Sequence, residues 1–349
     1  MQTHWRVSLL TVVLAMTGCR ERLSFDDAGA DAAPEDAPAE PSDVPTDAGS
    51  DAGPPCEGPP GLYVEGSCTV LAPGVRRFEP EYELWSDGAA KERFVLLPEG
   101  ERIDTTDPDA WVYPVGTVLF KTFSRDGLRI ETRINTKIAA APGIDSWTMR
   151  TFAWSEDQLS VTEVTAGVVD ALGTGHDIPP TTLCAGCHSG AAVDVGLGFT
   201  AIQLNHDAPE GEVTLERLFA EGSINAEIDL LDAVVPGDAT TRSALGYMHA
   251  NCGPCHGGPS PMPPGSPMDL WIDVGTSDPA LSGAYTTAVS APSLWPGAAL
   301  RVAPGMPDES AVILRMESRV VGTQMPPYAT ELPHGPGIAA VRGWILSLD

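Results

Sequence analysis

The sequence predicts an α+β fold, in which an N-terminal antiparallel β sandwich or barrel is followed by a mainly α-helical region. Residues 128–138 alternate strictly between apolar or threonine side chains and charged or amide side chains, which is the period of a half-buried strand. Other short apolar runs, separated by Gly, Pro and Asp, lie between Cys56 and Ile178, as is typical of antiparallel sheets. Beyond Pro179 the apolar residues recur at helical spacing. We therefore expect a β-rich domain over residues 56–178.

Within that domain, Asp126-Gly127 precedes the best-patterned strand and tolerates the positive φ of a hairpin turn, so residues 117–123 are its expected antiparallel partner. Further strands are predicted at residues 93–97, 147–154 and 160–169. In the central strand the isoleucines and threonines should face the core. The other row, Arg129, Glu131, Arg133, Asn135 and Lys137, should face the opposite way. Asp87, Asp104 and Glu131 are expected to be surface carboxylates.

Three helices are predicted in the second half, at residues 244–252, 307–319 and 338–348. In the first, Leu245, Met248 and Cys252 share one face, and Pro307 suits the first turn of the second. The third carries an apolar stripe flanked by Trp344, made of Ile338, Val341, Ile345 and Leu348.

The N-terminus has the features of an export signal. A short apolar run at residues 7–16 follows Arg6 and is too short to span a bilayer, but it suits a secretory signal peptide. Met16-Thr17-Gly18-Cys19 resembles a bacterial lipoprotein box, so we expect removal of residues 1–18 and acylation of Cys19, with simple secretion as the alternative. The expected location is the bacterial cell envelope, lipid-anchored, in the outer membrane and facing the periplasm or the outside.

Residues 19–55 are predicted to form a disordered acidic linker. Between Asp26 and Pro55 there are nine acidic residues and six prolines but no Lys or Arg, so this stretch cannot bury a core. Thirty such residues would span roughly 30 Å as a flexible coil.

The pattern Cys-x-x-Cys-His occurs twice, at residues 184–188 and 252–256. This pattern is the attachment site of c-type haem: two thiols about one turn apart can bind one porphyrin edge, and the next histidine binds the iron. A zinc ribbon would place its cysteine pairs roughly 15–20 residues apart, and here the two pairs are much farther apart. The sequence therefore predicts two covalently bound haem c groups. Cys184, Cys187, Cys252 and Cys255 attach them, and His188 and His256 are the proximal iron ligands.

Two cysteines, Cys56 and Cys68, have no other predicted role. Outside the cytoplasm free thiols tend to pair, so we expect a disulfide between them, with two independent thiols as the alternative.

Residues 240–349 resemble a class I cytochrome c domain, with a haem motif ending one helix, then a Met-Pro loop, then a final helix containing Trp344-Ile345. The resemblance implies that the final helix packs across the first, and that Met325 is the sixth iron ligand of the second haem. Two prolines after Met325 stiffen its loop. Met262, six residues past His256, is too near along the chain to pass round a porphyrin comfortably. The domain organisation then places the first haem-binding segment at residues 179–239.

The wider chain also resembles a group of little-characterised bacterial dihaem cytochromes. The matching stretches are Leu84-Trp85-Ser86-Asp87-Gly88, Pro114-Val115-Gly116-Thr117, Lys121-Thr122-Phe123 and Glu131-Thr132-Arg133. This second resemblance implies an architecture but no established reaction. The sixth ligand of the first haem stays open between His206, His176 and a vacant position, and His249, Met149 and Met248 are further candidates.

Two haems favour electron transfer as the function, because thioether-ligated iron is stabilised in its reduced state. The alternatives are a dihaem oxidoreductase or peroxidase-like enzyme with one open iron, and an envelope protein that binds a partner through its β domain. An enzyme would need acid–base residues beside the open iron, and the sequence does not identify any. The net charge of −28 disfavours nucleic acid as a partner and would suit basic redox proteins, or it only maintains solubility.

Overall fold

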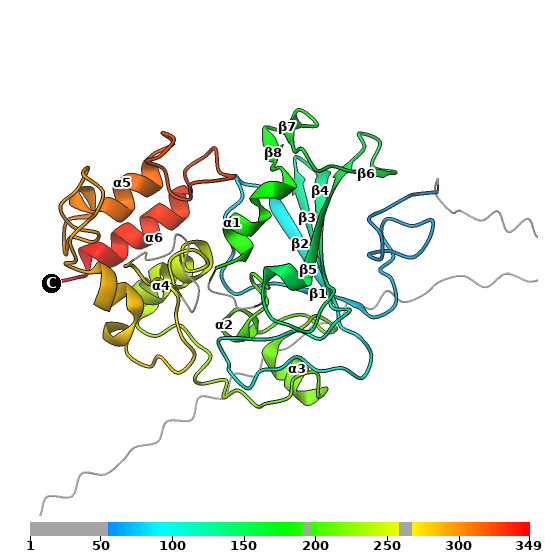
Figure 1. Cartoon of the computed structure of the whole chain (residues 1–349). Helices are drawn as coiled ribbons and strands as arrows, with labels where there is room; N and C mark the ends of the chain where they lie inside the picture. The colour runs from blue at the N-terminus through cyan, green and yellow to red at the C-terminus, as the bar shows by residue number, and fades with distance from the viewer. Residues whose placement is uncertain (1–54, 191–193, 195, 258–266) are drawn as a thin grey trace, which may run out of the picture. The chain divides into compact units, whose positions relative to one another are not determined.

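The computed structural model describes residues 55–190, 194, 196–257 and 267–349. It confirms the predicted α+β class, and residues 52–349 form one compact unit (Figure 1). The strands are β1 Val75–Phe78, β2 Ala90–Leu96, β3 Val118–Arg125, β4 Leu128–Lys137, β5 Trp147–Trp154, β6 Val161–Glu163, β7 Val168–Ala171 and β8 His176–Ile178. The α-helices are α1 Cys184–His188, α2 Ala201–Leu204, α3 Leu215–Ala220, α4 Ala239–Asn251, α5 Ala311–Glu317 and α6 Gly335–Leu346.

Strands β1 to β6 form a six-stranded antiparallel sheet in which each strand pairs with the next one along the chain. The predicted hairpin joins β3 to β4, with Arg125 opposite Leu128 and positive φ at Asp126 and Gly127. The strands expected at 93–97, 117–123, 128–138 and 147–154 are all present. The expected strand at 160–169 is instead divided between β6 and β7, and β7 pairs with β8 in a separate small sheet.

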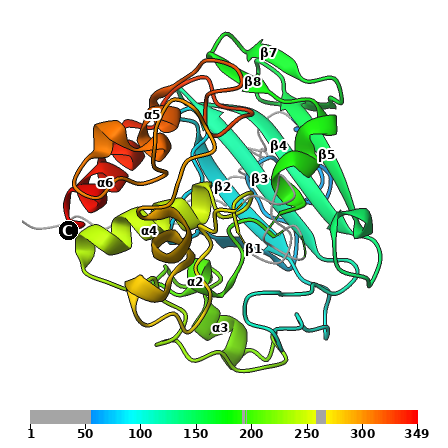
Figure 2. The same ribbon diagram turned by 60° about the vertical axis from the view of Figure 1, so that its left-hand side comes forward.

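Both faces of the sheet are covered. The prediction that the strand at residues 128–138 is half-buried, with one face toward water, is therefore corrected. One face packs an apolar cluster that includes Phe94, Phe120, Ile134 and Phe152. The opposite face carries Glu131, Arg133 and Lys137 of the charged row of β4, and the helices lie on that side (Figure 2). Arg129 does not continue this row, because a register shift at Ile130 separates it from Glu131 and its guanidinium lies over Trp154. The most buried charged residues on this face are Arg93, Glu131 and Lys137, each at most 2% exposed.

The carboxylates are corrected in the same way. Asp104 is exposed as expected, but Asp87 is 8% exposed and Glu131 is 0% exposed. An alternation of two residues along a strand indicates that its two faces differ in chemistry. It does not indicate which face is exposed to water.

The first and third predicted helices are present as α4 and α6, but the helix expected at 307–319 is divided into a 3-10 turn, Pro307–Glu309, and the shorter α5, because the backbone of Ser310 is extended. Helix α4 begins at the Asp238 cap, whose carboxylate accepts a hydrogen bond from the Thr241 N–H at 2.8 Å. A shared apolar cluster packs α4 against α6 through residues that include Leu245, Met248 and Trp344. The resemblance to a class I cytochrome c implies this helix pair. Trp344 is fully buried, and its Nε1–H donates to the Tyr285 hydroxyl at 3.0 Å.

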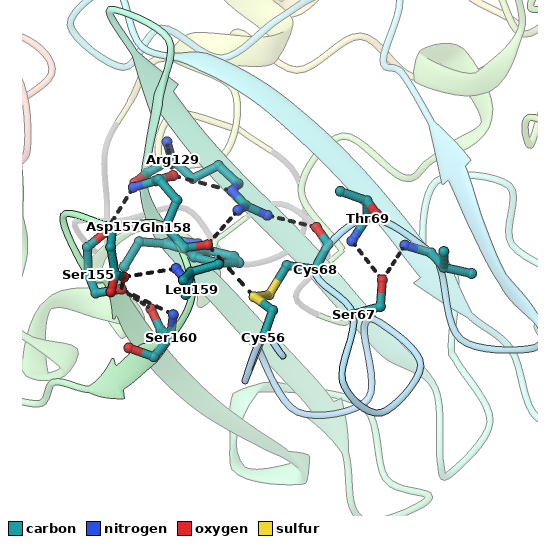
Figure 3. The surroundings of a disulfide bond; sticks show 12 residues. Cys56, Ser67, Cys68, Thr69, Arg129, Ser155, Asp157, Gln158, Leu159 and Ser160 are labelled. Carbon is teal, nitrogen blue, oxygen red and sulfur yellow. Dashed lines mark hydrogen bonds between the residues drawn. A yellow bond between two sulfur atoms is a disulfide. The ribbon is translucent and has the colours of Figure 1, made fainter. Parts of the chain in front are cut away.

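A disulfide joins Cys56 and Cys68, whose Cα atoms lie 5.7 Å apart (Figure 3). The Arg129 side chain connects the disulfide to the start of β4, because its guanidinium donates to the carbonyl oxygens of Cys68 and Gln158. The same guanidinium lies 3.7 Å above the Trp154 ring.

The expected signal peptide, the Cys19 acylation site, nearly all of the acidic linker and Met262 lie outside the described residues. Among the residues that are described, no helix is long and apolar enough to span a membrane.

Candidate functional site

The first Cys-x-x-Cys-His sequence forms helix α1, which lies beside the sheet on the side of α4 and α6 (Figure 1). Neither Cys184 nor Cys187 is in a disulfide, although Cys56 and Cys68 are. Burial raises the pKa of both motif thiols. Reactive redox dithiols have a lowered pKa instead, so the pair lacks the electrostatics of a dithiol oxidoreductase.

The charged face of the sheet lies next to this motif. Lys121 and Arg133 are close enough to Cys187 to interact with it electrostatically. Arg133 donates two hydrogen bonds to the Glu131 carboxylate, at 2.8 and 2.6 Å. The His176 Nε2 atom lies 2.9 Å from the same carboxylate. A cluster of Arg133, Glu131 and His176, in which the Glu131 and His176 side chains are buried and that of Arg133 is partly exposed, therefore borders α1.

Sequence reasoning missed this cluster, although the family resemblance used the stretch Glu131-Thr132-Arg133 and its neighbour in the sheet, Lys121-Thr122-Phe123. Lys121 lies directly opposite Arg133 in the sheet, and Phe123 lies directly opposite Glu131. The available signal was the repeated placement of charge on one row of adjacent strands. Such a row is costly to bury unless its charges are paired or bind something.

The second Cys-x-x-Cys-His sequence begins where α4 ends, and Cys252 is the C-terminal cap of that helix. The next turn is fixed by backbone hydrogen bonds from Cys255 and His256 to the Cys252 carbonyl oxygen, at 3.0 and 2.8 Å. Neither thiol is in a disulfide. Burial raises the pKa of Cys252 to about 12 and that of Cys255 to about 11.

The two motifs touch each other. The Cys255 thiol donates to the Gly186 carbonyl oxygen with Sγ and O 3.5 Å apart. Immediately after the first motif, a Cβ atom at Gly190 would overlap the Pro254 carbonyl oxygen, so only glycine permits this approach. Segments 64 and 69 residues apart in sequence are thus held in direct contact.

The loop that contains Met325 lies beside both motifs. The Met325 N–H donates to the Arg315 carbonyl oxygen at 2.9 Å, and Arg315 Nε donates to the Thr323 carbonyl oxygen at 2.8 Å. Burial, assisted by the charge of Arg315, lowers the pKa of His256. On the other side, the Tyr328 ring lies 3.7 Å from the position that a Cβ atom of Gly186 would occupy. Ligation of iron by Met325 remains a prediction. The loop that contains Met325 lies close to both motifs.

The segment Leu84–Gly88 connects this loop to the sheet. The Asp87 carboxylate accepts hydrogen bonds from the backbone N–H groups of Glu331 and Leu332, at 2.8 and 3.0 Å. The Trp85 N–H donates at 2.7 Å to the side-chain oxygen of Asn251, the residue just before the second motif. This segment therefore ties together the β sheet, the second motif and the chain that follows Met325.

We predict that Asp87→Ala loosens residues 326–333. The substitution removes an ionised acceptor of two backbone N–H groups, and each such bond contributes about 1.5–3 kcal/mol. Limited proteolysis should cut this loop at least several-fold faster in the variant. Asp87→Asn is the matched control, because it keeps one acceptor oxygen and tolerates the positive φ of 51°. Equal cleavage rates in the wild type and the alanine variant would contradict the prediction.

His176 and His206, two of the other candidate ligands of the first haem, have hydrogen-bond partners already. His176 binds Glu131, and His206 has Nε2 2.7 Å from the Glu79 carbonyl oxygen and Nδ1 2.9 Å from that of Asp207. Met248 lies in the apolar cluster between α4 and α6. The His249 Nδ1 atom accepts a hydrogen bond from the Ile272 N–H at 3.1 Å.

The residues present fit covalently bound haem. Each motif has two unpaired, partly buried thiols followed by a histidine, in a protein whose other described cysteines form a disulfide. Cationic side chains border the first motif, as carboxylate-bearing porphyrins require. Within the described ranges, no group of three or more His, Cys, Asp or Glu side chains converges as a metal site.

Comparison of this chain with protein-family models, with curated proteins and with solved structures finds no match.

Proposed function

We propose that this chain is a dihaem c-type cytochrome that transfers electrons at the bacterial cell envelope. The observation that carries the proposal is the direct contact between the two Cys-x-x-Cys-His turns, through Cys255 and Gly186. Covalent haem supplies an iron that cycles between the ferric and ferrous states. Electron transfer slows steeply with distance, so attachment sites in contact favour passage from one haem to the other.

In this proposal the chain's own residues fix the two sites. Cys184, Cys187, Cys252 and Cys255 attach the haems, His188 and His256 bind the irons, and Met325 is the sixth ligand at the second motif. Cys19 carries the lipid anchor. The net charge of −28 favours basic redox proteins as donor or acceptor.

The experiment is a count of covalent haem per chain. The protein should be expressed with a cytochrome c maturation system, denatured, and assayed by pyridine haemochrome. We expect two haems in the wild type and one in either Cys184→Ala/Cys187→Ala or Cys252→Ala/Cys255→Ala. A Cys56→Ser/Cys68→Ser variant that folds is the matched control and should keep both. A denatured wild-type chain without bound haem would refute the proposal.

One observation favours a second candidate function, an oxidoreductase with one open iron. His176 and Glu131 form a buried imidazole–carboxylate pair near the first motif, with Arg133 beside them. Such a pair can hold and release a proton, which a haem enzyme needs. Carbon monoxide separates the two functions. A spectral shift of one ferrous haem would indicate an open iron, whereas no shift would support the carrier.

A further inference from the structure

Three cationic residues lie side by side on adjacent strands, on the face of the sheet that the first motif covers. Arg93 on β2 is directly opposite Lys121 on β3, and Lys121 is directly opposite Arg133 on β4. Like charges in directly opposite positions repel, so each needs compensation. Arg93 has Glu79 at 2.7 Å and Glu83 at 3.3 Å.

Arg133 is paired with Glu131 at 2.6 Å. Lys121, the central cation, is the one that remains to be considered. Among the described residues, the Lys121 Nζ atom has no hydrogen-bond or ion-pair partner. Burial and the neighbouring charges of Arg93 and Arg133 lower the pKa of Lys121 to about 7. Lys121 is half-buried, and a bound anion would relieve the repulsion that it experiences from Arg93 and Arg133.

Lys121 and Arg93 of the sheet line a cavity together with Pro254, which lies inside the second motif. His249, Trp271 and Thr200 also line it. Lys121 is also close enough to Cys187 to interact with it electrostatically, so the cavity has a residue of the second motif in its lining and lies near the first.

Two further donors on this cavity have no partner. His249 is 1% exposed, and because its Nδ1 atom accepts the Ile272 N–H, the neutral ring carries its proton on Nε2. That Nε2 atom is buried without a hydrogen-bond partner among the described residues, and so is the Thr200 hydroxyl oxygen. Buried polar groups are nearly always hydrogen-bonded, so a missing acceptor is indicated.

All four groups, the Lys121 ammonium, the Arg93 guanidinium, the His249 imidazole N–H and the Thr200 hydroxyl, can donate hydrogen bonds, and two are cationic. No carboxylate is among the residues that line the cavity. We propose that this cavity is a carboxylate site, in which Lys121 is the principal cation and Arg93, His249 and Thr200 complete the hydrogen bonds. Ionised acceptors in such donor sets form the stronger class of hydrogen bond.

Two sources present this chemistry: a propionate of an attached haem, or a small free carboxylate. In the first form the inference rests on the proposed function, and the position of the cavity between the two motifs supports it. The His249 ring then acts as a donor toward the ligand rather than as an iron ligand.

The test compares four forms of the purified holoprotein: wild type, Lys121→Met, Lys121→Arg and Arg150→Met. The last is the control, because it removes one positive charge from an exposed position opposite Ile134, on the other face of the sheet. Reduction potentials are measured by spectroelectrochemistry. If a propionate is the ligand, Lys121→Met should lower the reduction equilibrium constant of one haem at least tenfold, which is 59 mV for one electron. Lys121→Arg and Arg150→Met should remain near the wild-type value.

The second arm is a titration with acetate, followed by thermal melting. If the ligand is a free carboxylate, acetate should raise the melting temperature of the wild type saturably but not that of Lys121→Met, and the potentials should not differ without acetate. Neither effect, in variants whose circular dichroism shows them folded, would overturn the inference. The haem count is independent of both arms. A chain without haem would refute the proposed function, and the acetate arm would still test the carboxylate site.

Discussion

Replacing Asp194 with alanine is expected to destabilise the protein by about 3–5 kcal/mol, the cost of breaking a buried ion pair by removal of one partner. The Asp194 carboxylate lies 2.5 Å from the Lys137 ammonium, and both side chains are 0% exposed. It also accepts hydrogen bonds from the Trp147 indole N–H and the Tyr113 backbone N–H. The alanine variant leaves the lysine charge and these two donors buried without this acceptor.

Urea unfolding of the two proteins measures this loss. Asp308→Ala is the matched control, since it breaks an aspartate–arginine pair at the surface, where water screens the charges, and should change the midpoint little. Lys137→Met combined with Asp194→Leu should recover part of the loss, because no buried charge then remains. Recovery should be incomplete, since Trp147 and Tyr113 still lack an acceptor. An unchanged midpoint in Asp194→Ala would contradict the prediction.

This pair also matters for the candidate site. Asp194 lies six residues after His188 and attaches that part of the chain to the end of β4 and the start of β5. We expect any structural change in Asp194→Ala to be larger at the first motif than at the second.

Glu131→Gln is expected to cost about 3 kcal/mol, the lower end of the range for a broken buried pair, because the amide still accepts one hydrogen bond. Glu131 is 0% exposed and is bound by Arg133 and His176. The substitution leaves Arg133 uncompensated beside Lys121. Glu163→Gln on the neighbouring exposed Arg150–Glu163 pair is the control and should unfold at nearly the wild-type urea concentration.

The Glu131 carboxyl also predicts a pH dependence. Burial would raise its pKa, but the charge of Arg133 and the hydrogen bonds from His176 and Arg133 outweigh burial and lower the pKa below its ordinary value of 4.5. A carboxyl with a lowered pKa in the folded state contributes stability above its unfolded pKa and loses it as the pH falls through its folded pKa. The stability difference between the wild type and Glu131→Gln should therefore be largest above pH about 4.5 and shrink in acid. A difference independent of pH would show that this carboxyl does not titrate with unfolding.

Local patterns predicted most of the secondary structure. The Asp126-Gly127 turn requires only neighbouring residues and is present as predicted. The alternation that follows it is present from Glu131 onward, but a register shift at Ile130 interrupts it. The apolar stripe of the last helix also packs as expected, with Val341 and Ile345 fully buried. Residues 160–169 were predicted less well, because a bend between β6 and β7 depends on the later strand β8.

The candidate site was predicted only in part. Its cysteines and histidines follow from a spacing that the chemistry of haem attachment requires, so the sequence by itself determined them as a hypothesis. Only the tertiary structure showed that Glu131 and Lys137 of the charged row of β4 are buried, and that Lys121 on β3 has no ion-pair partner among the described residues. It also decided that Cys255 reaches Gly186. The physical reason is the same in each case. Burial and contact depend on segments far apart in the chain, and a local pattern records the chemistry of each segment but not what lies opposite.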